Sequence, residues 1–400
     1  MEDPSGIELP EDFEDITEAL NNSDQAGASA KIIEYLEEQS KIPLNIAITG
    51  VSGSGKSTFV NAFRGLSNKD DGAAPTGCVE TTMEAEPYPH PNYPNVTLWD
   101  LPGIGTTSFP AAEYLTMFGF DKFDFFILIS SVRFRENDVK LALEIQKRKK
   151  KFYFVRTKID HNIQDEKRSQ RNFNAERTLQ LIRQNCVEGL QKQGVESPQV
   201  FLISSFDLSL YDFQLLVETM ERELPSHKRD ALLLAIVPVS QEILNKKKKA
   251  FEAQIKWHAL CSALTASVPV PGLSVAVDLG IFLTAINKYK IGFGVDIVSL
   301  QKLADSTNKP LSELQAVMTS PFAVPKVTTE VIIKVLTATG AQAALLLAEE
   351  GSRFIPILGI PLAAGFSFAA TYSSLKTCLD MVAEDAQNVL IKALGLNTSV

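Results

Sequence analysis

The stretch GVSGSGKS, Gly50 to Ser57, decides the fold of the chain around it. It follows the apolar run from Leu44 to Ile48, which is typical of a buried strand, and it precedes Phe59, Val60 and Ala62, which have the spacing of an apolar helix face. The backbone N–H groups of such a glycine-rich loop point at an anion, and the positive end of the following helix dipole adds to their field. We therefore predict a strand, a phosphate-binding loop and a helix, in this order.

The spacing of the loop matches G-x-x-x-x-G-K-[ST], in which each polar residue has a physical role. We predict that Lys56 reaches the β- and γ-phosphates of a nucleotide and that the hydroxyl of Ser57 ligates Mg²⁺. The residues expected to surround the phosphates are Gly50, Ser52, Gly53, Ser54, Gly55, Lys56, Ser57 and Thr58. The alternative is a plain glycine turn, which does not require the strand before the loop or the helix after it.

Composition limits the class of protein. The chain has 400 residues, of which 45% are apolar, so it can build two or three domains with real cores. Its formal net charge of -9 argues against a general nucleic-acid binder. Its 4 cysteines lie far apart, as expected for free thiols rather than for a zinc site or a disulfide framework. The acidic N-terminus lacks the pattern of a secretory signal peptide, so we expect a cytoplasmic protein.

Apolar runs alternate with helical patterns along the first half of the chain. Continuous hydrophobicity, as in FDFFILIS, is typical of strands that are buried on both faces of a parallel sheet. The predicted strands are Leu44–Ile48, Val96–Trp99, Phe123–Ile129, Phe152–Val155 and Val200–Ile203, and the helices between them include Lys140–Lys147 and Asn174–Leu190. This alternation predicts a doubly wound α/β domain with a mostly parallel sheet and a ligand at the carboxyl ends of its strands.

The second predicted strand ends in WDLPG, Trp99 to Gly103. A carboxylate at the position of Asp100 holds the metal ion in P-loop nucleotidases, usually through water. The backbone N–H of Gly103 is then placed to donate to the γ-phosphate. D-x-P-G alone is a common turn sequence, and its place at a strand end after Lys56 favours the metal role.

The fourth predicted strand runs into RTKID, Arg156 to Asp160, which indicates the base. In a [NT]-K-x-D motif the carboxylate accepts from the N1–H and the exocyclic amine of guanine, and the lysine stem covers the ring. Adenine has no such pair of donors on that edge, so Asp160 would be left buried without a partner. We predict that Thr157, Lys158 and Asp160 bind guanine and that the backbone of Ser204 and Ser205 meets its O6.

A polar segment between the loop and the metal strand, Gly72 to Pro91, has the place of a switch that orders with a nucleoside triphosphate. One of its threonines, Thr76, Thr81 or Thr82, is expected to bring a hydroxyl to Mg²⁺ and the γ-phosphate. We favour Thr76 as both metal ligand and catalytic residue.

These motifs resemble one family. The stretch GVSGSGKSTFVNAFRGL, the TGCVETT segment, DLPGIGT and the TKID motif are similar to the interferon-inducible immunity-related GTPases, in the subgroup with a GKS phosphate loop. The resemblance implies a dynamin-like GTPase with GTP as substrate, GDP as product and Mg²⁺ as cofactor. It further implies GTP-dependent self-association through the GTPase domain, possible pairing with related GTPases, and accumulation at the membranes of pathogen-containing vacuoles.

Catalysis requires a group that the chain lacks at the usual place. Ile104 follows DLPG, where Ras-type enzymes carry a glutamine that orients the attacking water. We therefore expect slow hydrolysis by the monomer and a faster rate on assembly. The resemblance implies that Glu80 acts across a dimer of GTPase domains; the alternative is a solvated loop carboxylate.

The chain changes character outside residues 41–224, which we predict to be the GTPase domain. Residues 1–40 contain an amphipathic pattern at Phe13, Ile16 and Leu20 and a second helical stretch, Ser29–Gln39. Residues 225–400 are rich in alanine and leucine, with prolines that are expected to end helices. We predict one all-α domain that is built from both ends of the chain.

Two uncharged segments leave the relation to membranes open. Phe354–Leu375 carries no charge over 22 residues, which is long enough to cross a bilayer, but two prolines and two glycines interrupt it. Leu260–Val277 is similar. Core packing, reversible membrane insertion and true spanning are the three interpretations. The lysine clusters 147–151 and 246–249 are either solvated faces or contacts with anionic lipid.

Three functions fit the sequence. The first is a GTP hydrolase whose nucleotide cycle controls self-assembly at membranes in cell-autonomous immunity. The second is a GTP-gated scaffold or filament protein in which hydrolysis is incidental. The third is a monomeric signalling switch, against which Ile104 and the large helical domain argue.

Overall fold

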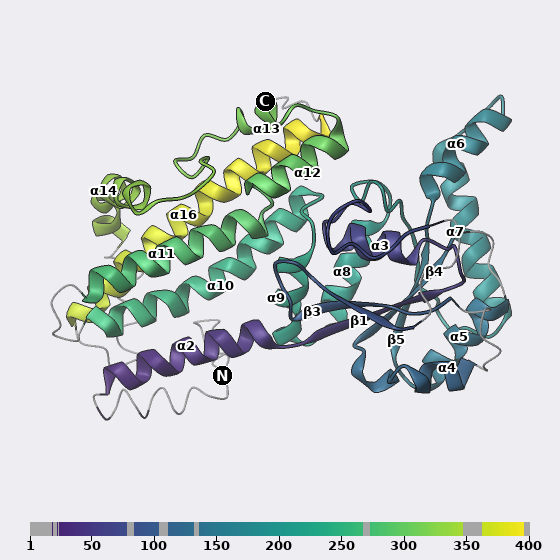
Figure 1. Cartoon of the computed structure of the whole chain (residues 1–400), viewed down its shortest axis with the longest axis horizontal. Helices are drawn as coiled ribbons and strands as arrows, with labels where there is room; N and C mark the ends of the chain where they lie inside the picture. Colours follow the sequence, from purple (N-terminus) through teal and green to yellow (C-terminus); the bar gives the residue numbers. More distant parts are fainter. Residues whose placement is uncertain are drawn as a thin grey trace. The chain divides into compact units, whose positions relative to one another are not determined.

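The structure is a computed structural model of the chain. It describes Glu18, Asn22 and residues 24–77, 84–103, 111–131, 136–266, 273–346 and 362–395. The chain divides into two compact units (Figure 1). One, here called the sheet unit, is Ile42–Ile243; the other, the helical unit, combines Met1–Lys41 with Leu244–Val400.

The sheet unit contains a six-stranded sheet in the order β2-β3-β1-β4-β5-β6. All neighbouring strands are parallel except the edge pair β2 and β3. The strands are β1 (Leu44–Gly50), β2 (Glu86–Pro89), β3 (Val96–Asp100), β4 (Phe125–Ser130), β5 (Lys151–Arg156) and β6 (Val200–Leu202). The predicted α/β class with a mostly parallel sheet is therefore confirmed.

Helices cover both faces of this sheet. The core on one face includes side chains from α3 (Lys56–Phe63), α8 (Phe213–Glu223) and α9 (Ser226–Ala235). The core on the other face includes side chains from α4 (Ala111–Met117), α5 (Glu136–Lys147), α6 (Ile159–Ser169) and α7 (Ala175–Lys192). This double layer explains why the central strands are apolar at every position rather than at alternate ones, since both sides of each strand are buried.

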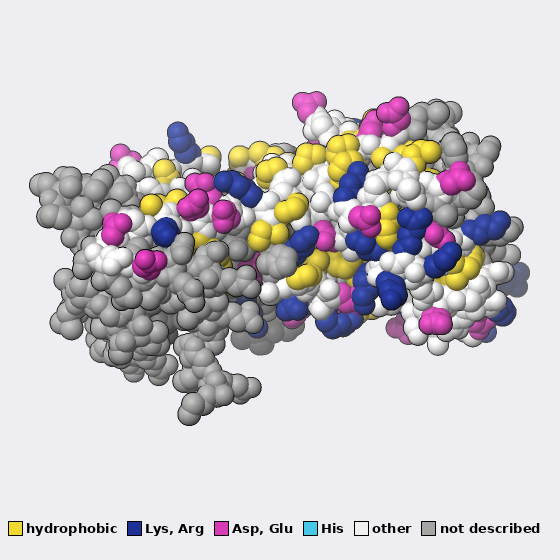
Figure 2. Space-filling view, turned by 90° about the horizontal axis from the view of Figure 1, so that it is seen from below, with side chains coloured by type: hydrophobic (Ala, Val, Ile, Leu, Met, Phe, Trp, Pro, Cys, Tyr) yellow, Lys and Arg dark blue, Asp and Glu magenta, His cyan; other side chains and the backbone are white. Residues whose placement is uncertain are grey.

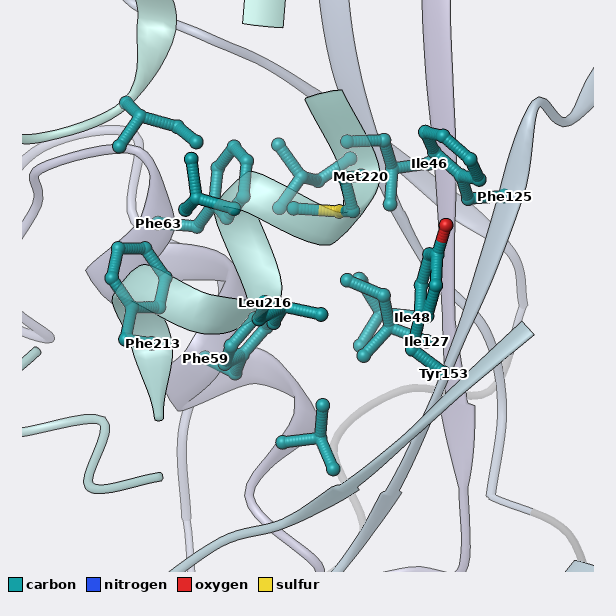
Figure 3. Packing of buried hydrophobic residues seen from close by; sticks show 14 of the residues in the cluster. Ile46, Ile48, Phe59, Phe63, Phe125, Ile127, Tyr153, Phe213, Leu216 and Met220 are labelled. Atoms are coloured by element: carbon teal, nitrogen blue, oxygen red, sulfur yellow. The ribbon is translucent and has the colours of Figure 1, made fainter. Parts of the chain in front are cut away.

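The packing of the first face is shown in Figure 3. Apolar side chains of the central strands, among them Ile46, Ile48 and Ile127, face aromatic side chains of α3 and α8. Phe63 and Phe213 meet edge to face with their ring centroids 6.3 Å apart. Because α3 begins with Lys56 and Ser57, burial of this helix against the sheet fixes the position of both polar residues.

The strand register brings the carboxyl ends of the strands to one edge. Ile48 pairs with Asp100, and Gly50 pairs with Ile129 of β4. Further along the sheet Ser130 pairs with Arg156, which in turn pairs with Leu202. The segments after all five parallel strands therefore emerge side by side, as expected for a ligand site in a doubly wound fold.

The helical unit is built from both ends of the chain. Ala28 and Ile32 of the N-terminal helix α2 (Gln25–Lys41) pack with Leu260 of α10 (Gln241–Ala266) and Phe368 of α16 (Leu362–Leu394). Helix α11 (Leu273–Gly292) lies beside α16 (Figure 1). The other described helices of this unit are α12 (Ile297–Thr307), α13 (Leu311–Gln315) and α14 (Thr329–Leu346).

The division between the units falls later than residue 225, where the sequence analysis places it. Helix α9 follows Pro225 but contributes Leu232 and Ala235 to the core of the sheet unit, and Ile243 joins the same core. The apolar side chains of this helix pack on the sheet. The domain boundary predicted from Pro225 and from composition therefore lies too early in the chain.

The two uncharged segments, for which core packing, membrane insertion and spanning are the alternatives, are only partly described. Residues 267–272 and 354–361 lie outside the described ranges, as do Phe13 and Ile16 of the amphipathic pattern. Among the helices that the structure does describe, none is both long enough and apolar enough to cross a membrane.

Candidate nucleotide-binding site

The loop after β1 has a backbone that only glycine adopts easily. Gly50, Gly53 and Gly55 all have positive φ angles, of 140°, 75° and 95°. A Cβ atom on Gly50 would overlap the carbonyl oxygen of Ile129, whereas a Cβ on Gly53 would meet nothing within 4 Å. Gly50 is therefore required by the neighbouring strand, and Gly53 leaves open space beside the loop.

Lys56 and Ser57 begin helix α3, directly after this loop. The ammonium of Lys56 donates to the carbonyl oxygens of Gly50 and Val51, at 3.4 and 3.3 Å, so it lies over the loop. The hydroxyl of Ser57 donates to Oδ2 of Asp100 at 2.5 Å. Asp100 is fully buried at the end of β3, one strand away from the loop. The structure thus brings together two of the three residues that are predicted to hold the metal, Ser57 and Asp100; the third, Thr76, makes no hydrogen bond with them within the described residues.

The DLPG turn packs against the loop. A Cβ atom added to Gly103 would lie 2.8 Å from the backbone nitrogen of Ser52, closer than real Cβ atoms approach. The absence of a side chain at Gly103 is therefore what allows the two backbones to meet. Ser52 itself is exposed, as is Gly53.

The TKID motif is tied to the same loop from the other side. The hydroxyl of Thr157 donates to the carbonyl oxygen of Ser54 at 2.7 Å, and the ammonium of Lys158 donates to that of Gly53 at 3.1 Å. Lys158 has a φ angle of 58°, which is unusual for a residue with a side chain. Asp160 follows in the first turn of α6, with its side chain 27% exposed. The loop and the motif thus form one hydrogen-bonded structure.

Three hydroxyl groups in this region have unused hydrogen-bonding capacity. The Oγ atoms of Ser54, Ser204 and Ser205 are buried and make no hydrogen bond within the described structure. Ser204 and Ser205 follow β6, next to the end of β5 that leads into the TKID motif. Buried hydroxyls without a partner are costly, so their presence here favours a ligand that supplies the partners.

The switch segment is described only in part. Thr76 lies in an irregular, exposed stretch. Glu80, Thr81, Thr82 and Ile104 lie outside the described residues. The start of the segment is held by α3, because Asn61 exchanges two hydrogen bonds with the backbone of Ala74, at 2.6 and 2.9 Å.

Two residues near the site carry no motif and were missed by the sequence analysis. One is Asn61; the other is Tyr114, whose hydroxyl donates to the carbonyl oxygen of Pro102 at 2.7 Å and lies 3.0 Å from the hydroxyl of Thr49. Burial raises the pKa of Tyr114 above its usual value, and the charge of Asp100 raises it further against the opposing effect of Thr49. Only the contacts across the fold identify these residues, since a tyrosine and an asparagine inside helices have no sequence signature.

The residues present fit a nucleotide with a divalent cation. The oxygens of Ser57 and Asp100 are hard ligands of the kind that Mg²⁺ prefers. The loop provides a lysine and a helix N-terminus for phosphates, and open space at Gly53 for their approach. The unpartnered hydroxyls of Ser54, Ser204 and Ser205 add further polar contacts.

The lysine cluster 147–151 lies on another part of the sheet unit, at the end of α5 and the start of β5. Lys150 donates to the carbonyl oxygen of Phe123, Arg148 pairs with Glu144, and Lys151 pairs with Glu223. Figure 2 shows Lys and Arg side chains gathered on one face of this unit. Much of the cluster thus makes local hydrogen bonds and ion pairs.

The interferon-inducible GTPase (IIGP) family model matches residues 9–393. The chain belongs to this family. It is 41% identical over 386 residues to interferon-inducible GTPase 5 of Rattus norvegicus, which covers 96% of this chain and 83% of the relative. It is 36% identical over 388 residues to interferon-gamma-inducible GTPase 10 of Mus musculus, covering 96% and 90%. It is 38% identical over 369 residues to interferon-inducible GTPase 1 of Mus musculus, covering 90% and 85%.

Family membership confirms the resemblance that the loop and motifs indicated. The chain is a GTP-binding protein of the interferon-inducible, immunity-related GTPases, and the nucleotide that it binds is the substrate of the enzyme.

Proposed function

We propose that the chain binds GTP with Mg²⁺ at the loop after β1 and hydrolyses it to GDP and phosphate, in a cycle that controls self-assembly. The observation that carries this proposal is the pairing of Ser57 with Asp100 at 2.5 Å, at the N-terminus of the helix that also carries Lys56. This pairing supports the proposal, because binding of a nucleoside triphosphate with Mg²⁺ requires oxygen ligands for the ion and an ammonium group for the phosphates close together.

Each residue of the site has a specific part in binding. The amides of residues 50–58 surround the α- and β-phosphates, and Lys56 moves from the carbonyl oxygens of the loop to the β- and γ-phosphates. Ser57, Asp100 and the switch residue Thr76 would hold Mg²⁺, which when bound would supply positive charge to the β- and γ-phosphates. Gly103 donates its N–H to the γ-phosphate.

Guanine is selected by the segment after β5. Asp160 accepts from the N1–H and the exocyclic amine of the base, and the stem of Lys158 covers the ring, as its contact with Gly53 allows. The backbone of Ser204 and Ser205, whose Oγ atoms are buried, meets O6. Adenine leaves the carboxylate of Asp160 without donors, and this loss opposes its binding.

Hydrolysis depends on assembly in this proposal. Ile104 cannot orient a water molecule, so an isolated chain turns over slowly. Glu80 supplies the missing polar group, together with Thr76, when two GTPase domains meet. The partner is a second copy of this chain or a related GTPase.

The setting of this activity is also a proposal. The chain acts in the cytoplasm and is recruited as a peripheral protein to intracellular membranes, including those of pathogen-containing vacuoles, in cell-autonomous immunity. The support is the family, whose relatives are named for induction by interferon.

The decisive experiment measures GTP turnover per molecule against protein concentration, with sedimentation in parallel. We expect turnover to rise from nanomolar to tens of micromolar protein as sedimentation shows assembly. The Glu80→Gln variant, which keeps the size of the side chain, should assemble but lose the rise. A turnover that stays flat while the chain assembles would contradict the coupling and favour a scaffold with incidental hydrolysis.

A further inference from the structure

One buried hydroxyl connects three parts of the site. Tyr114 is 3% exposed and lies on α4, and its Oη atom is within hydrogen-bond distance of two groups. One is the hydroxyl of Thr49, at 3.0 Å, which lies on β1 directly before the terminal residue Gly50. The other is the carbonyl oxygen of Pro102, at 2.7 Å, in the turn after β3.

The direction of these hydrogen bonds is fixed by the number of protons. A tyrosine hydroxyl has one proton, and a carbonyl oxygen can only accept, so Tyr114 donates to Pro102. Thr49 must then donate to Tyr114. A tyrosine hydroxyl is protonated at neutral pH, and burial raises the pKa of Tyr114 further above its usual value, so this order of donors holds. In such a chain each hydrogen bond strengthens the next.

The carbonyl group of Pro102 belongs to the same peptide unit as the N–H of Gly103. A peptide unit is planar, and in the trans form its C=O and N–H point in opposite directions. A hydrogen bond to the oxygen therefore fixes the direction of the N–H. It also polarises the unit, so the N–H becomes a better donor.

A hydrogen bond to this peptide unit matters because a glycine opposes rotation of its backbone less than other residues do. Pro102 has a fixed φ angle, but a glycine rotates more freely than any other residue. Its backbone also lies against the amide of Ser52, so a small rotation of this peptide changes the packing of the turn on the phosphate loop.

We propose that Tyr114 is a positioning residue that aims the N–H of Gly103 at the γ-phosphate and thereby sets the preference for GTP over GDP. This inference assumes the proposed nucleotide site, in which Gly103 contacts the γ-phosphate. Since GDP has no γ-phosphate, loss of the Tyr114 hydroxyl weakens binding of GTP and leaves binding of GDP nearly unchanged. A residue that only stabilised the fold would change both affinities together.

The test is the Tyr114→Phe variant of the full chain, which removes the hydroxyl and keeps the ring. Calorimetry with Mg²⁺ measures the affinity for GDP and for a nonhydrolysable GTP analogue. We expect the ratio of the two affinities to fall about tenfold, the equivalent of about 1.4 kcal/mol, in favour of GDP.

Tyr153→Phe is the matched control. Tyr153 is also fully buried, and its hydroxyl donates to Glu223 at 2.9 Å, in a contact that includes no residue of the proposed site. This variant loses the hydroxyl of another buried tyrosine, away from the proposed site, so it should lower the thermal stability and leave the ratio of affinities as in the wild type.

An unchanged ratio in a folded Tyr114→Phe variant would overturn the inference, as would an equal fall in the control. If Tyr114→Phe does not fold, the Thr49→Val variant decides, because it removes the donor to Tyr114 without changing the size of the side chain. A fall of about threefold in its ratio supports the inference, and an unchanged ratio overturns it. A wild-type chain that bound neither nucleotide would contradict the proposed function instead.

Discussion

The contact between Asn61 and Ala74 leads to the most detailed prediction, because it consists of two buried hydrogen bonds that a single substitution removes. Asn61 is 1% exposed on α3, one helical turn after Ser57. Its Nδ2 donates to the carbonyl oxygen of Ala74 at 2.9 Å, and its Oδ1 accepts from the amide of Ala74 at 2.6 Å. The change to test is Asn61→Ala, which leaves both backbone groups of Ala74 without partners.

The size of the effect follows from burial. Ala74 is 1% exposed, so its amide and carbonyl groups lose these hydrogen bonds without ready access to water. An unsatisfied buried polar group costs about 1 to 3 kcal/mol, so two of them should lower the free energy of unfolding by about 3 kcal/mol, with some relief if the segment shifts toward solvent. Asn68→Ala is the matched control, since Asn68 is exposed and its Oδ1 accepts one hydrogen bond from Nδ2 of Asn61. Its cost should stay below about 0.5 kcal/mol.

The two tryptophans make the assay specific to the sheet unit. Trp99 is on β3 and Trp257 is on α10, in the helical unit. In a Trp257→Phe background, Trp99 is the single tryptophan, and its fluorescence in a urea titration reports unfolding of the sheet unit. A loss under about 0.5 kcal/mol for Asn61→Ala would refute the argument that this side chain holds the start of the switch segment.

Three further predictions use other parts of the chain. Gly50→Ala should prevent folding of the sheet unit, because the added Cβ overlaps the carbonyl oxygen of Ile129. Gly53→Ala should lower the free energy of unfolding by only about 1 kcal/mol, since its Cβ meets nothing within 4 Å. Circular dichroism compares the two variants, and equal effects would contradict the packing argument. Asp160→Asn should shift the preference from guanine toward xanthine, and an unchanged preference in competition binding would rule out its role as the base acceptor. Burial lowers the pKa of His258 to about 4, and the charge of Lys288 adds to this effect, so the folded state favours the neutral ring. The free energy of unfolding should therefore be constant with respect to this group above pH 6.5 and should fall as the pH decreases from 6.5 toward 4, because the unfolded chain takes up a proton that the folded chain does not. The His258→Gln variant should flatten this part of the plot of stability against pH. An unchanged slope would show that His258 does not contribute.

Local patterns predicted most of the sheet. The five parallel strands were predicted within two residues at each end, because their apolar runs are short, continuous and bounded by polar residues. Strand β2 was missed, since Glu86–Pro89 contains two prolines, and proline is tolerated there only because β2 is an edge strand. Helix α6 was missed as well, because the stretch after Ile159 is strongly polar.

The candidate site could also be predicted only in part from the sequence. Motifs identified Lys56, Ser57 and Asp100, and the structure brings the last two together. Tyr114 and Asn61 act on the backbone of distant segments, and such contacts depend on the way the helices pack on the sheet. A single sequence holds no signal for them.

The central claim is that the loop after β1 and the TKID motif together bind a guanosine nucleotide. Calorimetric titration of the folded, full-length chain with GDP, a nonhydrolysable GTP analogue and the corresponding ATP analogue, all with Mg²⁺, tests it most directly. We predict one site per chain for each guanosine nucleotide and no measurable binding of the ATP analogue. Absence of heat with both guanosine nucleotides, or equal affinity for the ATP analogue, would contradict the account.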